Sequence, residues 1–287
     1  MSARSPLPAR VLIPVANPAT AEELVRLGAS LVDRRAGELT ALGIVEVPEG
    51  MPLSEGATRA RQARRLLQRV LDFAPEGTAI HPIVRIGRRA AEGIIEAAAE
   101  QEADLIIFGW GGKFSPHREG RGSREASETG NGRHEPPVFS PTIDEVVRES
   151  PCDIAVVKQR GSAEFRRVLV PVRGGPHAEL ALHFADAIAE RHGAELVVLH
   201  LLPVGVTAAV RAQAERALAA FIRQNVRGRA TPLLREVVNV RSAILREAER
   251  ADLVVMGASV VAGLPAGDGH GVLFGALPEA IATRARP

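Results

Sequence analysis

The sequence has few cysteines, few aromatic residues and no long apolar run, and each shortage excludes a class of protein. Cys152 is the one cysteine among 287 residues, so neither an internal disulfide nor a cysteine-based zinc site is expected. Aromatic residues make up 3% and tyrosine is absent, which argues against a nucleic-acid partner whose bases stack on aromatic rings. No apolar run approaches the ~18 residues of a membrane span. Because the N-terminal residues also lack the apolar stretch of a signal peptide, we expect a cytoplasmic protein.

Lysine is nearly missing as well, although the chain is basic. Lys113 and Lys158 are the two lysines, so the pI of about 9.3 reflects arginine, and the formal net charge is only +2. A composition of 46% hydrophobic and 24% charged residues is typical of a globular protein with a packed core. The length suits two domains of about 100–200 residues each.

An internal repeat divides the chain into two copies of one domain. Arg10–Val15 returns as Arg167–Val172, with the same arginine, proline and apolar positions. Ala103–Gly109 returns in the same way as Ala251–Gly257. Because both pairs keep their order along the chain, we expect a duplicated domain rather than two unrelated ones.

In the first copy, short apolar runs alternate with segments of helical periodicity. The expected strands are Val11–Val15, Leu39–Val47, Ile80–Ile86, Leu105–Phe108 and Ile154–Val157, and the expected helices are Ala21–Arg34, Thr58–Phe73, Arg89–Gln101 and Ile143–Glu149. Strands that are apolar throughout and alternate with helices indicate a parallel, doubly wound α/β sheet, here with five strands.

The second copy repeats this pattern but ends one strand earlier. Its expected elements are Val168–Val172, Ala178–Arg191, Glu195–Leu201, Ala209–Gln224, Leu233–Val238, Ser242–Glu249, Leu253–Met256 and Pro278–Thr283. No counterpart of Ile154–Val157 follows, so we expect four strands in this sheet. The predicted domains are residues 1–160 and residues 165–287.

One segment lies outside the repeat. Lys113–Pro137 is rich in glycine, serine, arginine, glutamate and histidine and has almost no apolar residues. It cannot bury enough surface to fold alone, so we expect a long flexible insertion in the first domain. Its counterpart in the second domain, Val260–Gly271, is shorter.

Open parallel sheets bind ligands beyond the carboxyl ends of their strands, where the strand order reverses. Three segments of the first copy would meet there: Ala16–Pro18, Glu46–Pro48 and Gly109–Gly112. Glycines let backbone N–H groups approach a phosphate, and hydroxyl groups before the next helix would add donors. The candidate binding residues are Val15, Ala16, Asn17, Val47, Gly109, Gly111, Gly112, Ser140 and Thr142. The structural alternative is that the glycines only make a tight exit from the strand.

Several of these stretches together resemble the universal stress protein family in its UspA-like, tandem-domain form. The resemblance rests on the Pro-Val ending of the first strand, on Ala103–Gly109 and on Thr142–Val157, and it extends over nearly the whole chain. Val170–Ala181 and Leu273–Glu279 are most similar to copies found as cytosolic domains of bacterial transporters and permeases. The resemblance implies an adenine-nucleotide α-hydrolase-like fold and, in many members, binding of ATP or AMP.

The family's nucleotide-binding pattern is only partly present. Members that bind ATP carry an aspartate after the first strand, where this sequence has Ala16 in the first copy and Arg173 in the second. Of the family's Gly-x-x-Gly-x9-Gly-Ser/Thr loop, the first copy keeps Gly109 and Gly112 but closes with Ser140-Pro141 after the insertion. We therefore expect ATP or AMP in the first domain and a degenerate second site.

The sequence predicts neither catalysis nor a metal site. Cys152 stands before a strand, and no motif supplies it with a base. The eight histidines are scattered without metal-ligand spacing. Asp104 and Asp252 recur at the same helix-to-strand turn, which is a structural position rather than a pair of facing carboxylates.

The most basic segment is the helix expected over Thr58–Phe73. It carries five arginines, namely Arg59, Arg61, Arg64, Arg65 and Arg69. Such a run is usually a solvated helix face. The alternative is contact with an anionic surface, such as phospholipid headgroups beside a transporter.

These observations favour a non-enzymatic, tandem module for stress response or transporter regulation. One alternative is a structural or interaction module that binds no nucleotide. Another is an ATP-consuming enzyme of the same fold, but that class needs a phosphate motif where this chain has Ala16-Asn17-Pro18. The open edge of a four-stranded second sheet predicts a homodimer or a strand borrowed from elsewhere.

Overall fold

The computed structural model describes residues 7–33, 37–72, 75, 77–110, 138–158, 165–260 and 273–285. The predicted insertion Lys113–Pro137 lies outside these residues, as does all of Val260–Gly271 except its first residue. Nine strands form two sheets within the described part of the chain. They are β1 (Arg10–Pro14), β2 (Glu38–Glu46), β3 (Ala79–Gly87), β4 (Leu105–Trp110), β5 (Asp153–Lys158), β6 (Arg167–Pro171), β7 (Glu195–Pro203), β8 (Ala230–Val237) and β9 (Leu253–Val254).

Both sheets are parallel and have the reversed strand order of a doubly wound fold. The first runs β3-β2-β1-β4-β5 and the second β8-β7-β6-β9. All seven strand pairs are parallel, from β1 against β2 to β7 against β8. The predicted fold class, with five strands in one sheet and four in the other, is therefore confirmed for the described residues.

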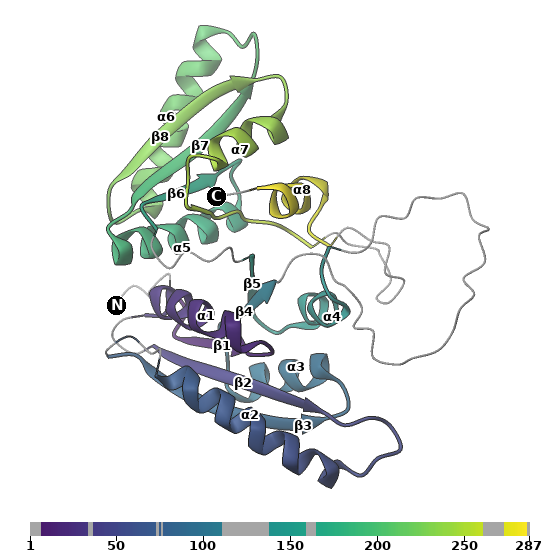
Figure 1. Ribbon diagram of the computed structural model, residues 1–287. Coiled ribbons are helices and arrows are strands. Elements are labelled where there is room, and N and C mark those ends of the chain that lie inside the picture. The colour runs from purple at the N-terminus through teal and green to yellow at the C-terminus, as the bar shows by residue number, and fades with distance from the viewer. Residues whose placement is uncertain are drawn as a thin grey trace, which may run out of the picture.

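Helices connect the strands and cover the sheets (Figure 1). They are α1 (Pro18–Leu31), α2 (Gly56–Leu71), α3 (Ala90–Glu100), α4 (Pro141–Glu149), α5 (Pro176–His192), α6 (Ala208–Asn225), α7 (Val240–Ala248) and α8 (Ala276–Arg284), with a short 3-10 turn, η1 (Leu53–Glu55), before α2. The central strands are apolar on both faces because helices pack on each side. Val11, Leu12 and Ile13 of β1 are accordingly at most 1% exposed.

The two repeated aspartates tie corresponding strands together. Asp104 Oδ2 accepts hydrogen bonds from the backbone N of Ala9 at 2.9 Å and of Arg10 at 3.0 Å. Asp252 Oδ2 does the same for the residues before and at the start of β6, at 2.8 and 2.9 Å. Each carboxylate satisfies two amides at the beginning of a central strand, which agrees with the structural role that the repeat predicted.

The two domains meet through corresponding helices. α1 of the first domain packs against α5 of the second, and both lie between the two sheets (Figure 1). Leu27 of α1 and Phe184 of α5 belong to one apolar cluster that runs from β1 in the first domain to β6 and β7 in the second. Because the same element of each copy faces its counterpart, the interface resembles that of a two-fold symmetric dimer.

Candidate functional site

A cavity of about 530 Å³ lies where β1 and β2 of the first domain end. The residues that line it come from the end of β1, from β2 and from one face of α2: Val15, Ala16, Gly43, Ile44, Val45, Glu46, Arg59, Gln62, Ala63, Leu66 and Leu67. Of the nine candidate residues, Val15 and Ala16 are therefore part of the wall. This is the edge of the sheet at which a parallel α/β fold binds its ligands.

Two polar side chains at this cavity come from α2, which the sequence analysis did not include in the site. Arg59 and Gln62 both line the cavity. Arg59 Nη1 lies 3.4 Å from the backbone oxygen of Glu46, at the end of β2. The spacing of three residues between Arg59 and Gln62 places both on one helix face, and that spacing was the signal available in the sequence.

Glu46 is a further residue that the candidate set missed. Its Oε1 accepts a hydrogen bond of 2.7 Å from the backbone N of Ala90, the first residue of α3. The carboxylate thus satisfies one of the amide groups that a helix leaves without an internal partner at its N-terminus. Glu46 therefore both lines the cavity and fixes α3 against the end of β2.

The backbone groups of Val47 and Asn17 form hydrogen bonds near the cavity, but neither residue lines it. Val47 is 2% exposed, and its N–H donates to the oxygen of Gly87 at 2.9 Å. Arg88 Nη1 donates to the oxygen of Val47 at 3.2 Å. The backbone oxygen of Asn17 accepts from the N–H of Thr20 at 3.3 Å, in the first turn of α1.

Gly109 lies inside β4 and not at an exit from the strand, and a close contact with α1 accounts for its missing side chain. A Cβ at this position would lie 3.0 Å from Cδ1 of Leu24 in α1. The missing side chain therefore lets α1 pack closely on the sheet. Gly111 and Gly112 fall outside the described residues.

Ser140 and Thr142 lie at the start of α4, away from the cavity wall. Ser140 Oγ accepts a hydrogen bond of 3.3 Å from the backbone N of Ile143, so this serine is the N-cap of α4. Thr142 is half-buried in the first turn. Of the candidate residues that the structure describes, Val15 and Ala16 line the cavity, and the others lie elsewhere.

After β9 of the second domain, the start of α5 lies close to the chain. A Cβ on Gly257, which follows β9, would lie 2.1 Å from the backbone oxygen of His177. This close approach leaves no room for a side chain at position 257. In the same domain, Nδ1 of His200 on β7 lies 3.1 Å from the backbone oxygen of Val172 at the end of β6.

Cys152 shows no sign of activation. Burial raises the pKa of its thiol, and a hydrogen bond with Ser150 opposes this only in part. A raised pKa keeps the sulfur protonated and therefore a poor nucleophile.

Within the described ranges, no group of three or more His, Cys, Asp or Glu side chains is arranged to hold a metal ion. No helix among the same residues is long and apolar enough to cross a membrane.

The chain belongs to the universal stress protein family. The sequence model of that family matches residues 9–158 and again residues 164–286, so each half of the chain carries one copy.

The Na⁺/H⁺ antiporter NhaS5 of Synechocystis sp. is 30% identical to this chain over 196 residues. That alignment covers 67% of this chain and 26% of the antiporter. The chain therefore spans about a quarter of the length of this transporter.

Two solved structures share the fold over nearly the full length. A universal stress protein from Archaeoglobus fulgidus is 17% identical, covers 96% of this chain and 93% of its own, and superposes with a TM-score of 0.60. A putative universal stress protein from Pseudomonas aeruginosa is 15% identical, with coverages of 98% and 91% and a TM-score of 0.58. Identities this low support the fold alone.

Proposed function

We propose that the chain is a non-enzymatic regulatory module whose first domain binds an adenine nucleotide, ATP or AMP. The observation that carries this proposal is the cavity of about 530 Å³ at the carboxyl ends of β1 and β2. The second domain has Arg173 where the first has Ala16, so the two domains are unequal at this position. In this proposal the first domain binds the ligand and the second serves as its structural partner.

The polar groups of the cavity suit a nucleotide. The amide of Gln62 offers a donor and an acceptor, as the edge of adenine requires. The guanidinium of Arg59 can pair with a phosphate through two parallel hydrogen bonds. Val15 and Ala16 supply an apolar wall for the base. At position 16, after the first strand, the family's ATP-binding members carry an aspartate, whereas this chain has an alanine and therefore no carboxylate.

Calorimetric titration with ATP, ADP and AMP tests this function. Arg59→Gln is expected to weaken ATP binding about tenfold, because one charged partner of the phosphates is lost, and to weaken AMP binding less. Ala16→Asp is expected to tighten binding about tenfold by restoring an acceptor for the amino group of adenine.

Arg65→Gln is the matched control, because Arg65 is exposed on the same helix and does not line the cavity. Wild-type protein that binds none of the three nucleotides would overturn the nucleotide proposal and favour the purely structural module. Sustained hydrolysis of ATP by pure protein would overturn the non-enzymatic part.

The 30% sequence identity with part of a Na⁺/H⁺ antiporter supports a membrane transporter as the regulated partner. In this proposal the module works at the cytoplasmic side, and nucleotide occupancy of the first domain sets the transport rate. Self-association as a homodimer belongs to the same proposal and is measured by light scattering over a range of concentrations. The proposal predicts that nucleotide changes the ion-exchange rate of such a transporter in vesicles only when this chain is present.

A further inference from the structure

A row of three arginines runs along the exposed side of α2. Arg61, Arg65 and Arg69 follow one another at intervals of four residues, and all three are exposed. Residues four apart are neighbours on one helix face, so the three side chains form a line about 12 Å long, the basic face of α2. The buried residues of the helix, among them Ala60 and Leu67, lie on the opposite face, which packs on the sheet.

The charge of the basic face is not balanced within the described part of the chain. No aspartate or glutamate occurs within Gly56–Leu71, and none of the three arginine side chains forms an ion pair with a described residue. On the neighbouring strand β3, in contrast, Arg85 pairs with Glu96 and Glu100. Like charges four residues apart repel each other and destabilise a helix. The stability of α2 therefore does not explain the row.

The corresponding helix of the second domain has no such row. α6 contains Arg211, Arg216 and Arg223, which are not four residues apart, and Glu215 interrupts their positive charge. Arg211 also forms an ion pair with Glu236 of β8. Because both domains have the same fold, that fold does not require the basic face of α2, and an external partner is the remaining explanation.

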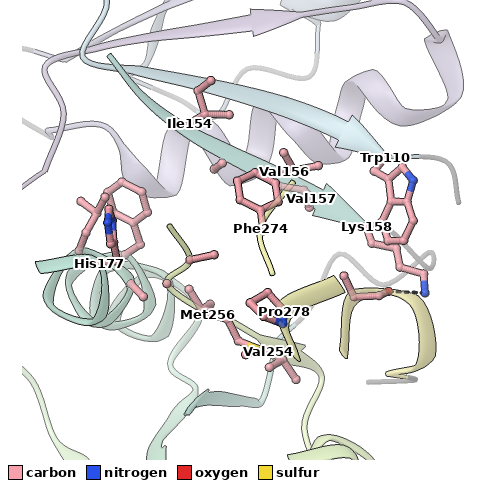
Figure 2. A pocket seen from close by; sticks show the side chains of 18 of the residues that line it. Trp110, Ile154, Val156, Val157, Lys158, His177, Val254, Met256, Phe274 and Pro278 are labelled. Atoms are coloured by element: carbon pink, nitrogen blue, oxygen red, sulfur yellow. Dashed lines mark hydrogen bonds between the residues drawn. The ribbon is translucent and has the colours of Figure 1, made fainter. Parts of the chain in front are cut away.

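The lysine at the interface between the domains shows how a basic group is used internally. Lys158 lines an apolar cavity of about 400 Å³ there, and its Nζ donates to the backbone oxygens of Ala282 at 2.7 Å and Thr283 at 2.8 Å (Figure 2). α2 lies instead on the outer side of the first domain, away from the second (Figure 1). Its basic face is therefore accessible to a partner that approaches the first domain from outside.

Exposed apolar side chains gather at the beginning of the same helix. Met51 and Leu53 belong to the segment that leads into α2, and both are exposed. Ile86 is also exposed and lies against the first residue of α2, since a Cβ on Gly56 would be 2.7 Å from its Cγ2. These three are the exposed large apolar residues among the described residues of the first domain. Basic groups beside exposed apolar side chains are typical of a surface that lies on a membrane.

The chemistry of the basic face favours phospholipid over a protein partner. Guanidinium groups bind phosphate oxygens through paired hydrogen bonds. The cytoplasmic loops of a membrane transporter are themselves rich in lysine and arginine and would repel the row, whereas anionic headgroups attract it. The choice of a membrane over other polyanions rests on the proposed regulation of a transporter, which the relationship with an antiporter supports.

We propose that the basic face of α2 binds the anionic phospholipid surface of a membrane, with Met51 and Leu53 entering the headgroup layer. The arginine row supplies the attraction. Glu49 and Glu55 are exposed beside Met51 and Leu53, so these apolar side chains enter only shallowly. Arg59, which lines the proposed nucleotide cavity, belongs to the same helix. A module bound in this way holds that cavity close to the membrane.

Co-sedimentation of the 287-residue protein with vesicles tests the proposal. We expect saturable binding to vesicles of phosphatidylcholine with about one third phosphatidylglycerol, and no binding to phosphatidylcholine alone. Binding should largely disappear when NaCl is raised from about 0.1 M to about 1 M, because the Debye length falls from about 10 Å to about 3 Å. Equal binding to the neutral vesicles, or binding to neither kind, would overturn the proposal.

A variant that combines Arg61→Gln with Arg65→Gln should bind the anionic vesicles about 25-fold more weakly, since each arginine near such a surface contributes about fivefold. Its melting temperature should not fall, because repulsion within the row is relieved. The matched control combines Arg216→Gln with Arg223→Gln, which removes the same charge from exposed positions of α6 and should leave vesicle binding nearly unchanged. An equal loss in both variants would reveal a general effect of charge and contradict the proposal.

Leu53→Ser separates a lipid surface from other polyanions. It should lower the affinity for anionic vesicles about fivefold, because the exposed part of the leucine no longer gains apolar surroundings, and should not affect binding to RNA. Tighter binding to RNA than to vesicles, with no effect of Leu53→Ser on either, would identify a nucleic-acid partner and overturn the proposal.

Titration with ATP distinguishes this proposal from the nucleotide proposal. Neither Arg61 nor Arg65 lines the nucleotide cavity, so the double variant that loses vesicle binding should keep the wild-type affinity for ATP. Vesicle binding by a wild-type protein that binds no nucleotide would leave the lipid surface in place and remove only the nucleotide site. A double variant that loses both activities would show that the basic face is not a separate surface.

Discussion

Glu279, in the first turn of α8, is a carboxylate placed among apolar residues and is only 8% exposed. Burial raises the pKa of this group, and the hydrogen bond of 3.0 Å from the N–H of Phe274 to its Oε1 opposes this only in part. An acid with a raised pKa binds its proton more tightly in the folded state than in the unfolded state. Protonated Glu279 therefore stabilises the fold fully below the ordinary carboxyl pKa of 4.5, and this contribution is lost as the pH rises through the raised pKa of the folded state.

Glu279→Gln is accordingly expected to stabilise the protein near neutral pH. The amide keeps an oxygen for the N–H of Phe274 and carries no charge to desolvate. Urea unfolding at about pH 4 and about pH 7 measures the effect, and the gain should shrink toward the lower pH as Glu279 becomes protonated in both states. A variant that is less stable than wild type at neutral pH would contradict this.

At the scale of the element, two glycines set how closely helices approach the sheets. A Cβ on Gly109 would meet the flexible end of a leucine, Cδ1 of Leu24, at 3.0 Å, whereas a Cβ on Gly257 would meet backbone, the oxygen of His177, at 2.1 Å. A side chain can move aside, but the start of α5 can do so only by shifting the helix. The two positions therefore differ in cost although they correspond in the repeat.

Gly257→Ala is expected to destabilise the protein by about 3 kcal/mol, and Gly109→Ala by about 1 kcal/mol. Unfolding in urea gives both values. In the variant Leu24→Ala, which removes the opposing side chain, the cost of Gly109→Ala should disappear. Equal losses of unfolding free energy in the two variants would show that the start of α5 leaves room for a side chain at position 257.

The apolar repeats made the strands and their parallel order predictable, but not the limits of the elements or the site. β8 begins at Ala230 and not at Leu233, because pairing of β7 with β8 extends through Thr231 and Pro232, which are exposed. The spacing of Arg59 and Gln62 indicated a shared helix face, but only the packing of α2 on β2 brings that face to the cavity. The loop glycines suggested a phosphate site, whereas Gly109 is explained by its contact with α1.

At the scale of the whole molecule, the two domains share one continuous apolar core. The cluster that contains Val11 and Leu39 of the first domain also contains Leu182 and Leu196 of the second. Neither domain can lose its structure without exposing apolar surface of the other, so both should unfold together. The regulatory proposal depends on this coupling, since a nucleotide in the first domain can affect the second only through a shared interface.

Leu27→Asp tests the coupling directly. Leu27 is 8% exposed at the contact of α1 with α5, and an unpaired carboxylate there would cost several kcal/mol at the interface while sparing the centre of each sheet. Scanning calorimetry should show one transition for the wild-type protein and two for the variant. Leu53→Asp is the control, because Leu53 is 48% exposed and lies outside that core, so it should keep a single transition. A single, merely lowered transition in Leu27→Asp would mean that the domains are coupled by more than the contact between α1 and α5.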